Sequence, residues 1–443
     1  MEASEIKQLD RMHIMHPWAV NDSLDPKVIR DAKGVYLYDA EGNRILDFSS
    51  QMKCVNIGYK NQKVIQAIQQ QAAALCFISP SFSYVSRSRL VKRLAEVTPG
   101  DLNHFFFTLG GADANENALK MARLYTGKHK ILAFYRSYHG ATYGAVSLSG
   151  DPRRPMVEPG IPGVVHVLNP YCYRCPFGLG YPQCNLHCAD HVAEIISYET
   201  PETIAAFFLE PITGAGGVIV PPDGYLQRVK SICEANGILL ITDEIMTGFG
   251  RSGRWFAMEH WDVVPDIMTM AKGLTSAYVP LGCVAVSDKV AKKIAKEYLH
   301  CGLTYSGHPL SCAAACAVID VYQEDRLVEN SGNLGKYLEI ELRRLQQRHA
   351  CVGDVRCKGL FACLELVKNR RTRQPLVPYN AKGAAAKPTG QVSRMLMSRG
   401  VYAPLRWMFL PISPPLCIDK DELNKGICVV DEVLGEVDAL IDE

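Results

Sequence analysis

The stretch Gly237–Gly253 reads GILLITDEIMTGFGRSG and decides the fold of the chain. Four consecutive apolar residues, Ile238–Ile241, lead through Thr242 into two adjacent acids, Asp243 and Glu244. A continuous apolar run of this kind is typical of a strand buried on both faces in a parallel sheet. Because ligands gather beyond the carboxyl ends of such strands, the pattern predicts a ligand near Asp243. A helix cap or a surface acid pair is the alternative interpretation.

A second apolar run, Asp266–Met270, ends in Ala271-Lys272-Gly273. A lysine just beyond a buried strand loses hydration, which lowers its pKa and favours the nucleophilic amine. Schiff-base chemistry needs an unprotonated amine that attacks an aldehyde, and later a base that moves a proton. Lys272 is therefore a candidate for both roles, and an exposed lysine that opens a turn is the alternative.

Two further segments supply small and aromatic residues after predicted strands. Residues 105–120, FFFTLGGADANENALK, run through two glycines into a helix that we expect to begin near Ala112. Small residues let the backbone approach a phosphate, and the free N–H groups of a helix start can bind it. Tyr138 is followed by His139 and Gly140. Its ring suits stacking on a flat cofactor or packing in the core, and we interpret His139 as structural.

The middle of the chain alternates apolar runs with amphipathic stretches, which is typical of an α/β fold. The predicted strands are His104–Thr108, Lys130–Phe134, Ala205–Leu209, Gly237–Thr242, Asp266–Met270 and Leu281–Val286. The predicted helices are Val64–Leu75, Ser88–Val97, Asn115–Tyr125, Leu226–Ala235 and Leu310–Tyr322.

The two ends of the chain are more mixed in character than the middle. We expect a large domain over residues 61–324 and a small αβ domain built from residues 1–60 and 325–443. The stretch from Arg370 to Thr389 mixes Pro, Gly, basic and small residues, and it predicts either a surface excursion or an ordered lid.

Composition excludes several classes of protein. Hydrophobic residues make up 48% of the 443 residues and charged residues 21%, which indicates a large core. The formal charge of +2 does not favour nucleic acid or an anionic membrane as a partner. Met1–Trp18 carries charges throughout and does not resemble a signal peptide, so we expect a cytoplasmic protein. In that compartment the 16 cysteines are expected to be reduced.

These segments together resemble the class III aminotransferases of the fold-type I pyridoxal-phosphate (PLP) superfamily. The resemblance runs from about Leu46 to Ile418. Its most specific parts are LEPITGAGG at 209–217, TDEIMTGFGRSG at 242–253, AKGL at 271–274 and TYSGHPL at 304–310. It implies a large central domain with a mainly parallel sheet flanked by helices. It also implies a homodimer, with a tetramer built from two such dimers as the alternative.

The resemblance also implies roles for individual residues. Lys272 would carry the cofactor as a Schiff base and shuttle a proton, and Asp243 would pair with the pyridine nitrogen. The other cofactor contacts that it implies are Gly111 and Ala112 at the phosphate, Tyr138 and Ile245 on the two faces of the ring, Glu210 near the cofactor, and Thr304 reaching the phosphate of a neighbouring subunit.

The sequence departs from the family pattern in three places. Hydroxyl residues are common in the family where Gly110-Gly111-Ala112 stands here, and glutamine is common at the place of Met246. The arginine that holds the substrate's acid group in the family falls on Pro404. Arg406 is the candidate for that role, since arginine clamps carboxylate or sulfonate groups well. An outward-facing Arg406 is the alternative.

Trp18 is a candidate for the substrate entrance or an anchoring contact of the first helix.

Four cysteines lie close together in PYCYRCPFGLGYPQCNLHCA, at Cys172, Cys175, Cys184 and Cys188. Thiols at such spacing can bind zinc or an iron–sulfur cluster. We favour reduced thiols that pack a turn-rich loop, with the metal site or a redox pair as alternatives.

The resemblance predicts transfer of an amino group, in two half-reactions, from an amine donor to an oxo acid such as 2-oxoglutarate or pyruvate. The resemblance favours an amine donor whose amino group lies far from its acid group. Taurine is the first candidate, and β-alanine and 4-aminobutyrate come next. The alternatives are a PLP-dependent lyase or epimerising enzyme on the same scaffold, and a non-catalytic metal-binding scaffold.

Overall fold

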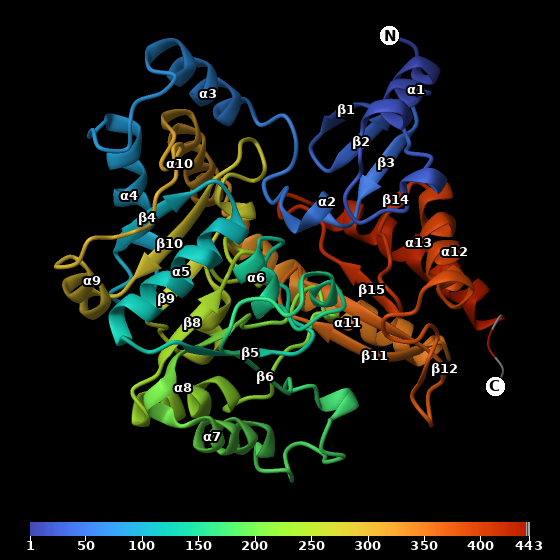
Figure 1. The fold of residues 1–443 in the computed structure, drawn as a ribbon. Helices are drawn as coiled ribbons and strands as arrows, with labels where there is room; N and C mark the ends of the chain where they lie inside the picture. The colour runs from blue at the N-terminus through green and yellow to red at the C-terminus, as the bar shows by residue number, and fades with distance from the viewer. Residues whose placement is uncertain (440, 442–443) are drawn as a thin grey trace.

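A seven-stranded sheet lies at the centre of the molecule. The structure is a computed structural model that describes residues 1–439 and 441. The strand order is β4-β10-β9-β8-β7-β5-β6 (Figure 1). These strands are β4 His104–Thr108, β5 Lys130–Phe134, β6 Val164–Val167, β7 Ile204–Leu209, β8 Leu239–Asp243, β9 Ile267–Met270 and β10 Gly282–Val286. The α/β fold with a mostly parallel sheet is confirmed, and each predicted strand is confirmed within two residues at its ends.

The direction of the strands brings several loops to one edge of the sheet. Strands β5, β7, β8 and β9 are parallel neighbours. Strand β10 is antiparallel to both β9 and β4, so β4 runs in the same direction as the parallel set. The carboxyl ends of these five strands therefore meet at the same edge, where ligands bind in open α/β sheets.

Helices cover both faces of this sheet because its strands are apolar on both sides. Alternate residues of β5 belong to different clusters: Ile131 and Ala133 pack with α5, whereas Leu132 and Phe134 pack with α7 and α8. The helices that precede, cover or follow the central strands are α3 Gln62–Ala74, α4 Val85–Val97, α5 Gly111–Thr126, α6 Tyr143–Leu148, α7 His187–Glu199, α8 Tyr225–Ala235, α9 Asp288–Ile294 and α10 Pro309–Glu324.

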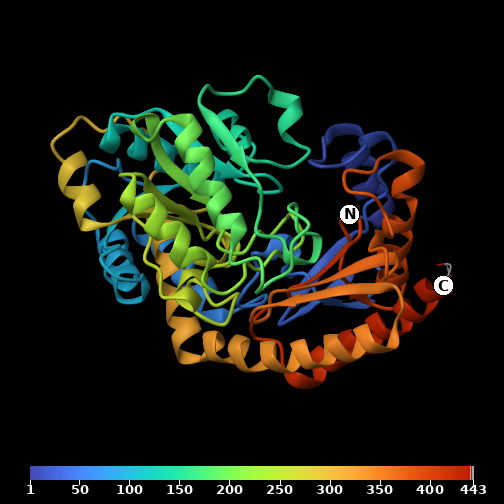
Figure 2. The same ribbon diagram turned by 90° about the horizontal axis from the view of Figure 1, so that it is seen from below.

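The N-terminal and C-terminal parts of the chain share a second sheet. Its order is β1-β2-β3-β14, and β14 pairs in parallel with β3. A third sheet joins β11, β12, β13 and β15, and Figure 2 shows the long helix α11 running alongside this part of the molecule. We propose on this basis that residues 1–60 and 325–443 form one small domain. The helices and strands of these two parts of the chain are α1 Ala3–His13, β1 Ile29–Lys33, β2 Tyr36–Asp39, β3 Arg44–Asp47, α2 Ser50–Lys53, α11 Leu327–Arg348, β11 Val352–Cys357, β12 Ala362–Asn369, β13 Gln374–Pro375, α12 Lys387–Ser398, β14 Val401–Tyr402, β15 Phe409–Ile412 and α13 Lys420–Asp438.

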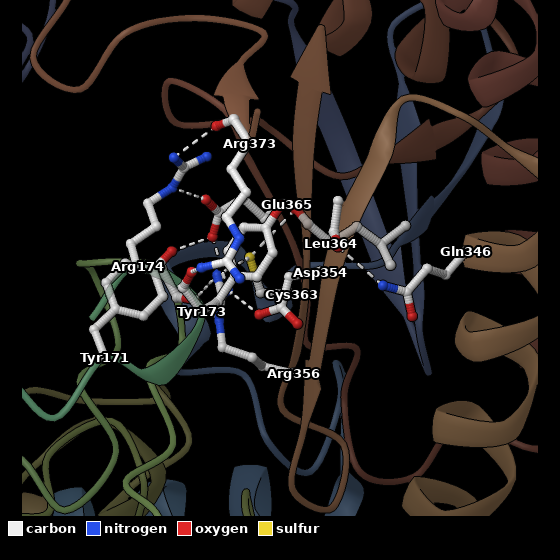
Figure 3. A network of polar contacts seen from close by, with 12 residues as sticks. Tyr171, Tyr173, Arg174, Gln346, Asp354, Arg356, Cys363, Leu364, Glu365 and Arg373 are labelled. Atoms are coloured by element: carbon white, nitrogen blue, oxygen red, sulfur yellow. Dashed lines mark hydrogen bonds and ion pairs between the residues drawn. The ribbon is translucent and has the colours of Figure 1, made fainter. Parts of the chain in front are cut away.

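A buried polar network fastens the loop after β6 to the third sheet (Figure 3). Glu365 on β12 is fully buried, and its carboxylate accepts hydrogen bonds from Tyr171, Arg174 and Arg356. Arg356 on β11 also pairs with Asp354, 2.6 Å away. Because an unpaired buried charge is costly, these contacts fix the loop against β11 and β12.

The stretch Arg370–Thr389 is ordered rather than a free excursion. Its residues 374–375 form β13, which pairs with β12. Tyr379 packs against Trp407 with ring centroids 4.4 Å apart. No helix in the described part of the chain is long and apolar enough to cross a membrane.

Arg251 joins the large domain to both ends of the chain. It has no exposed surface, and burial lowers its pKa to about 10. Its guanidinium donates to Ser50 Oγ and Asn56 Oδ1 at 2.9 and 2.8 Å, and to the carbonyls of Leu360 and Pro414 at 3.0 and 2.6 Å. One side chain therefore satisfies acceptors from three distant segments.

The variant Arg251→Met should lower the free energy of unfolding by about 3 kcal/mol, because it leaves several buried acceptors without a donor. The midpoint of urea unfolding, followed by circular dichroism, measures this change. Arg254→Gln is the matched control, since Arg254 is exposed three residues away. An unchanged midpoint for Arg251→Met would contradict the role assigned to Arg251.

Candidate active site

A cavity of about 460 Å³ opens at the edge where the strands end. Loops after β4, β5, β7, β8 and β9 supply most of its walls. Of the residues predicted from the sequence, those that line it are Gly111, Ala112, Tyr138, Glu210, Asp243, Ile245 and Lys272. The structure therefore brings together side chains and backbone segments that lie far apart along the chain.

The start of α5 forms one wall of the cavity. Gly110 is its N-cap, and the space beside Gly110 is open. The first N–H groups of a helix have no partner within the helix, so this end can bind an anion. Gly140 adopts φ +140°, and a Cβ there would lie 2.6 Å from the Cβ of Ala112. Glycine is required at 140 because the loop after β5 passes so close to the start of α5.

Asp243, at the end of β8, is held by three donors. Its Oδ2 accepts from Asn115 Nδ2 and lies 2.8 Å from His139 Nδ1, and its Oδ1 accepts from the N–H of Ile245 at 3.0 Å. Because a carboxylate only accepts hydrogen bonds, Nδ1 of His139 is the donor. Thr269 in turn donates to Asn115 Oδ1. This arrangement fixes the orientation of the Asp243 carboxylate at the wall of the cavity.

Lys272 follows β9 and begins a 3₁₀ turn, Lys272–Leu274. Its φ of +41° is unusual for a residue with a side chain, and strain of this kind is found mainly at functional sites. Burial lowers the pKa of Lys272, and the nearby Asp243 opposes that shift. The amine is thus shifted toward the unprotonated form that a nucleophile or a base needs.

Tyr138 and Glu210 are neighbours in the same wall. One face of the Tyr138 ring is covered by the guanidinium of Arg153, whose Cζ lies 3.4 Å from the ring centroid. Glu210 accepts from the N–H groups of Tyr138 and Gly214, both at 2.9 Å. Burial raises the pKa of Glu210 to about 7. Glu210 thus fixes the backbone of Tyr138 and of the loop after β7.

Three predicted residues lie outside this cavity. Thr304 is exposed in a turn before α10, and Trp18 is 63% exposed. Arg406 pairs with Asp151 at 3.0 Å and stacks on Trp407. The contact of Thr304 with a neighbouring subunit and the substrate contacts of Trp18 and Arg406 stay predictions.

Sequence reasoning missed three residues at the site. His139 is buried and, through its hydrogen bond to Asp243, does more than fill the core. Asn115 lies in the first turns of α5, and only the fold brings it to Asp243. Burial lowers the pKa of Lys53 to about 8, and the charge of Lys272 acts in the same direction. The run Ser50, Gln51 and Lys53 at positive φ marks a strained turn that no sequence signal revealed.

The four clustered cysteines line a small cavity of about 20 Å³ away from this site. All 16 cysteines are free thiols. Within residues 1–439 and 441, no group of three or more His, Cys, Asp or Glu side chains is arranged to hold a metal ion. The metal and redox interpretations of Cys172, Cys175, Cys184 and Cys188 stay hypotheses.

The model of the family "Aminotransferase class-III" matches residues 19–434. The chain belongs to this family. Class III aminotransferases use PLP, so this enzyme is a PLP-dependent aminotransferase, and the resemblance stated from its sequence is confirmed.

Similar proteins support the assignment over the whole chain. The putrescine–pyruvate aminotransferase of Pseudomonas aeruginosa is 35% identical, and the match covers 99% of this chain and 97% of that protein. The leucine/methionine racemase of Thermococcus litoralis is 34% identical, with 97% and 95% covered. The crystal structure of taurine:2-oxoglutarate aminotransferase from Bifidobacterium kashiwanohense, in complex with PLP and glutamate, superimposes with a TM-score of 0.95 at 39% identity and covers 100% of this chain and 99% of that one.

The cavity of this aminotransferase fits PLP by its own chemistry. It offers an amine at Lys272, a carboxylate with buried supporting donors at Asp243, and a helix start with open space for a phosphate at Gly110. These groups match the aldehyde, the ring nitrogen and the phosphate of PLP in kind.

The variant His139→Gln should lower kcat by about 10- to 100-fold with a smaller effect on KM, because a hydrogen bond to a buried charged group is weakened. Steady-state kinetics and the pH profile of kcat measure this effect. The matched control is His104→Gln, since His104 on β4 pairs with Asp288 at the exposed surface. Equal kinetics for the two variants would show that His139 does not support Asp243.

Proposed function

We propose that this aminotransferase moves an amino group from an ω-amino acid or amine to an oxo acid, with Lys272 and Asp243 as its catalytic residues. The observation that carries the proposal is the position of both side chains in one cavity at the ends of adjacent strands, β9 and β8. When bound, PLP supplies an aldehyde that takes up the amino group and a ring that withdraws electrons from the reacting carbon.

Lys272 is suited to move the proton in each half-reaction. Its Nζ takes a proton from the substrate carbon that bears the amino group, and returns a proton within the same cavity. Burial supports this role because it lowers the pKa of Lys272, and the strained turn supports it because it fixes the direction of the backbone. An amine whose pKa is lowered toward the working pH is better able to serve as both base and acid.

Asp243 is suited to keep the cofactor's ring nitrogen protonated. A buried carboxylate that faces this nitrogen favours its charged form. His139 and Asn115 both donate to Oδ2, whereas Oδ1 accepts only from the N–H of Ile245 among the described residues, which leaves Oδ1 able to take a further donor. Asn115 and His139 therefore act as positioning residues for Asp243.

The remaining cofactor contacts follow from the walls of the cavity. Gly111 and Ala112 lie at the start of α5 and would donate backbone N–H groups to the phosphate. Tyr138 has one ring face under Arg153 and offers the other to the cofactor ring. Ile245 packs against the backbone of Gly111, where a Cβ would come within 2.7 Å of its Cδ1, and would cover the opposite ring face. Glu210 holds the backbone of Tyr138 in position.

The proposed donor is taurine, with β-alanine and 4-aminobutyrate next, and the proposed acceptors are 2-oxoglutarate and pyruvate. The names of similar proteins include taurine, putrescine, 2-oxoglutarate and pyruvate as substrates. Arg406 and Trp18 are the proposed substrate contacts from the sequence.

Since the chain is an aminotransferase, the non-catalytic scaffold is excluded. Epimerisation stays an alternative because a racemase is among the similar proteins.

A homodimer in the cytoplasm completes the proposal. Thr304 is exposed and outside the cavity of its own chain, which is the position required of a residue that serves a neighbouring site.

The first test is the visible spectrum of the purified enzyme loaded with PLP. Adding taurine without an acceptor should bleach the colour of the bound cofactor, and 2-oxoglutarate should restore it. Lys272→Ala should abolish the bleaching, because no amine remains to move the proton. Lys292→Ala is the control, since Lys292 is exposed on α9.

Other outcomes of these experiments would support an alternative reaction or contradict the proposed one. Product formed from an amine with no oxo acid would support a lyase, and loss of optical activity of an amino acid without an acceptor would support a racemase. Bleaching that persists in Lys272→Ala would contradict the role of Lys272. A loaded protein that responds to no amine would refute the proposed reaction.

The variant Thr304→Ala should weaken the affinity for PLP by about tenfold, because one hydrogen bond to a charged phosphate is lost. Equilibrium dialysis against PLP measures this affinity, and sedimentation measures the mass of the assembly. A monomeric enzyme with full affinity for PLP would contradict the shared site.

A further inference from the structure

A second lysine, Lys53, lies at the end of α2, the short segment that follows β3. Ser50, Gln51 and Lys53 in this segment have φ of +44°, +55° and +59°. Residues with side chains rarely adopt positive φ, and they keep it only where the surrounding structure imposes it. The direction of this turn is therefore fixed by its neighbours and not by local preference.

Asp47, at the end of β3, holds this turn in place. It is fully buried, and its carboxylate accepts from the N–H of Ser49 at 3.0 Å and from the N–H of Gln51 at 3.1 Å. The hydroxyl of Tyr59 also donates to it, at 2.7 Å. The amine of Lys53 donates instead to Ser49 Oγ at 3.0 Å, and it forms no ion pair with a carboxylate within residues 1–439 and 441.

The chain directly after α2 packs on the turn that carries Lys272. The N–H of Ile57 donates to Ser276 Oγ at 3.0 Å. A Cβ on Gly273 would lie 2.6 Å from Nδ2 of Asn56, so only glycine fits there without a shift of its neighbour. Because Gly273 directly follows Lys272, these contacts hold the two lysine-bearing turns against each other.

Charged and titratable groups surround the amine of Lys53. Burial lowers the pKa of Lys53 to about 8, and the charge of Lys272 is the next largest cause of this shift. Arg251 acts in the same direction, whereas Asp47 and Cys54 act against it. A lysine is charged below its pKa, so Lys53 is positive below about pH 8 and loses its charge as the pH rises through that value.

The repulsion between Lys53 and Lys272 acts on both amines. Because the interaction of two titrating groups is mutual, a charge on Lys53 disfavours a proton on Lys272 as much as the reverse. The other groups that act on Lys272 are Asp243, Cys54 and Glu210, which favour its charged form, and Arg153, which opposes that form. The carboxylates of the site thus favour a proton on Lys272, and the charge of Lys53 offsets their effect.

We propose that the positive charge of Lys53 repels a proton from Lys272 and so keeps that amine free to take up PLP and to accept the proton of the substrate. Lys53 acts through Lys272, so it is a positioning residue and not a catalytic one. The inference rests on the proposed role of Lys272 as the base. A lysine beside a second cation is a known way to obtain a nucleophilic amine. This function also gives a reason for a half-buried charge without a carboxylate partner, which is otherwise costly.

The test measures the protonation of Lys272 in two ways. A pH titration of the visible spectrum of the PLP-loaded enzyme reports whether the nitrogen that joins Lys272 to PLP carries a proton. Acetic anhydride reacts only with unprotonated amines, so labelling of the full-length chain before PLP is added, read by mass spectrometry, reports on the free amine at each pH. Lys53→Met and Lys53→Gln remove the charge, and Lys53→Arg keeps it. Lys33→Met is the matched control, since Lys33 is exposed at the end of β1.

We expect Lys53→Met and Lys53→Gln to raise the midpoint of both titrations by about one pH unit, as for the loss of a like charge nearby. Labelling of Lys272 at neutral pH should then slow by about tenfold, because each unit lowers the unprotonated fraction tenfold. Lys53→Arg should keep the wild-type behaviour at neutral pH. It should also keep the repulsion above about pH 8, where Lys53 itself becomes neutral. Lys33→Met should change neither titration.

Midpoints equal to those of the wild type in Lys53→Met and Lys53→Gln would overturn the proposal. A shift of the same size in Lys53→Arg would overturn it as well, because the shape of the turn and not the charge would then be responsible. Failure of the wild-type chain to bind PLP through Lys272 would refute the proposed function instead. The labelling still reports on the two lysines in that case, because it requires neither PLP nor turnover.

Discussion

The buried carboxylate of Asp243 is the constraint on which the site depends. A charge at the end of β8 is tolerated only because Asn115, His139 and the N–H of Ile245 donate to it. Each donor belongs to a different part of the large domain: α5, the loop after β5 and the loop after β8. These hydrogen bonds therefore require that the start of α5 lie beside the ends of β5 and β8. The same arrangement forms the cavity beside Lys272.

Parallel strands explain why residues far apart in the sequence act together. Strands β5, β7, β8 and β9 deliver Tyr138, Glu210, Asp243 and Lys272 to a common edge. Strand β4 delivers the start of α5 to the same edge, although it is separated from β9 by the antiparallel β10. The edge thus gathers an amine, two carboxylates and a helix start that can bind an anion, and the amine, the Asp243 carboxylate and the helix start match PLP in kind.

A second set of contacts, outside the cavity, joins the loops of the central sheet to the C-terminal part of the chain. Arg356 on β11 holds the loop at Gly217, and Arg406 shares Asp151 with Arg153. Tyr379 and Trp407 pack together. The cavity wall and these contacts therefore have different origins: strand ends build the first, and packing of distant segments builds the second.

The sequence by itself determined the α/β fold, the strands that carry the site, the family and the cofactor. The fold and the strands follow from local signals, namely apolar runs of strand length, whereas the family and the cofactor follow from the resemblance of the motifs at 209–217, 242–253, 271–274 and 304–310 to class III aminotransferases. The tertiary structure alone decided the partners of those residues. His139 was interpreted as structural, Asn115 carried no signal inside its helix, and Arg153 was indistinguishable from a surface arginine. The physical reason is that a hydrogen bond or an unbalanced charge depends on which distant side chains the fold brings within a few ångströms, and no local pattern encodes that distance.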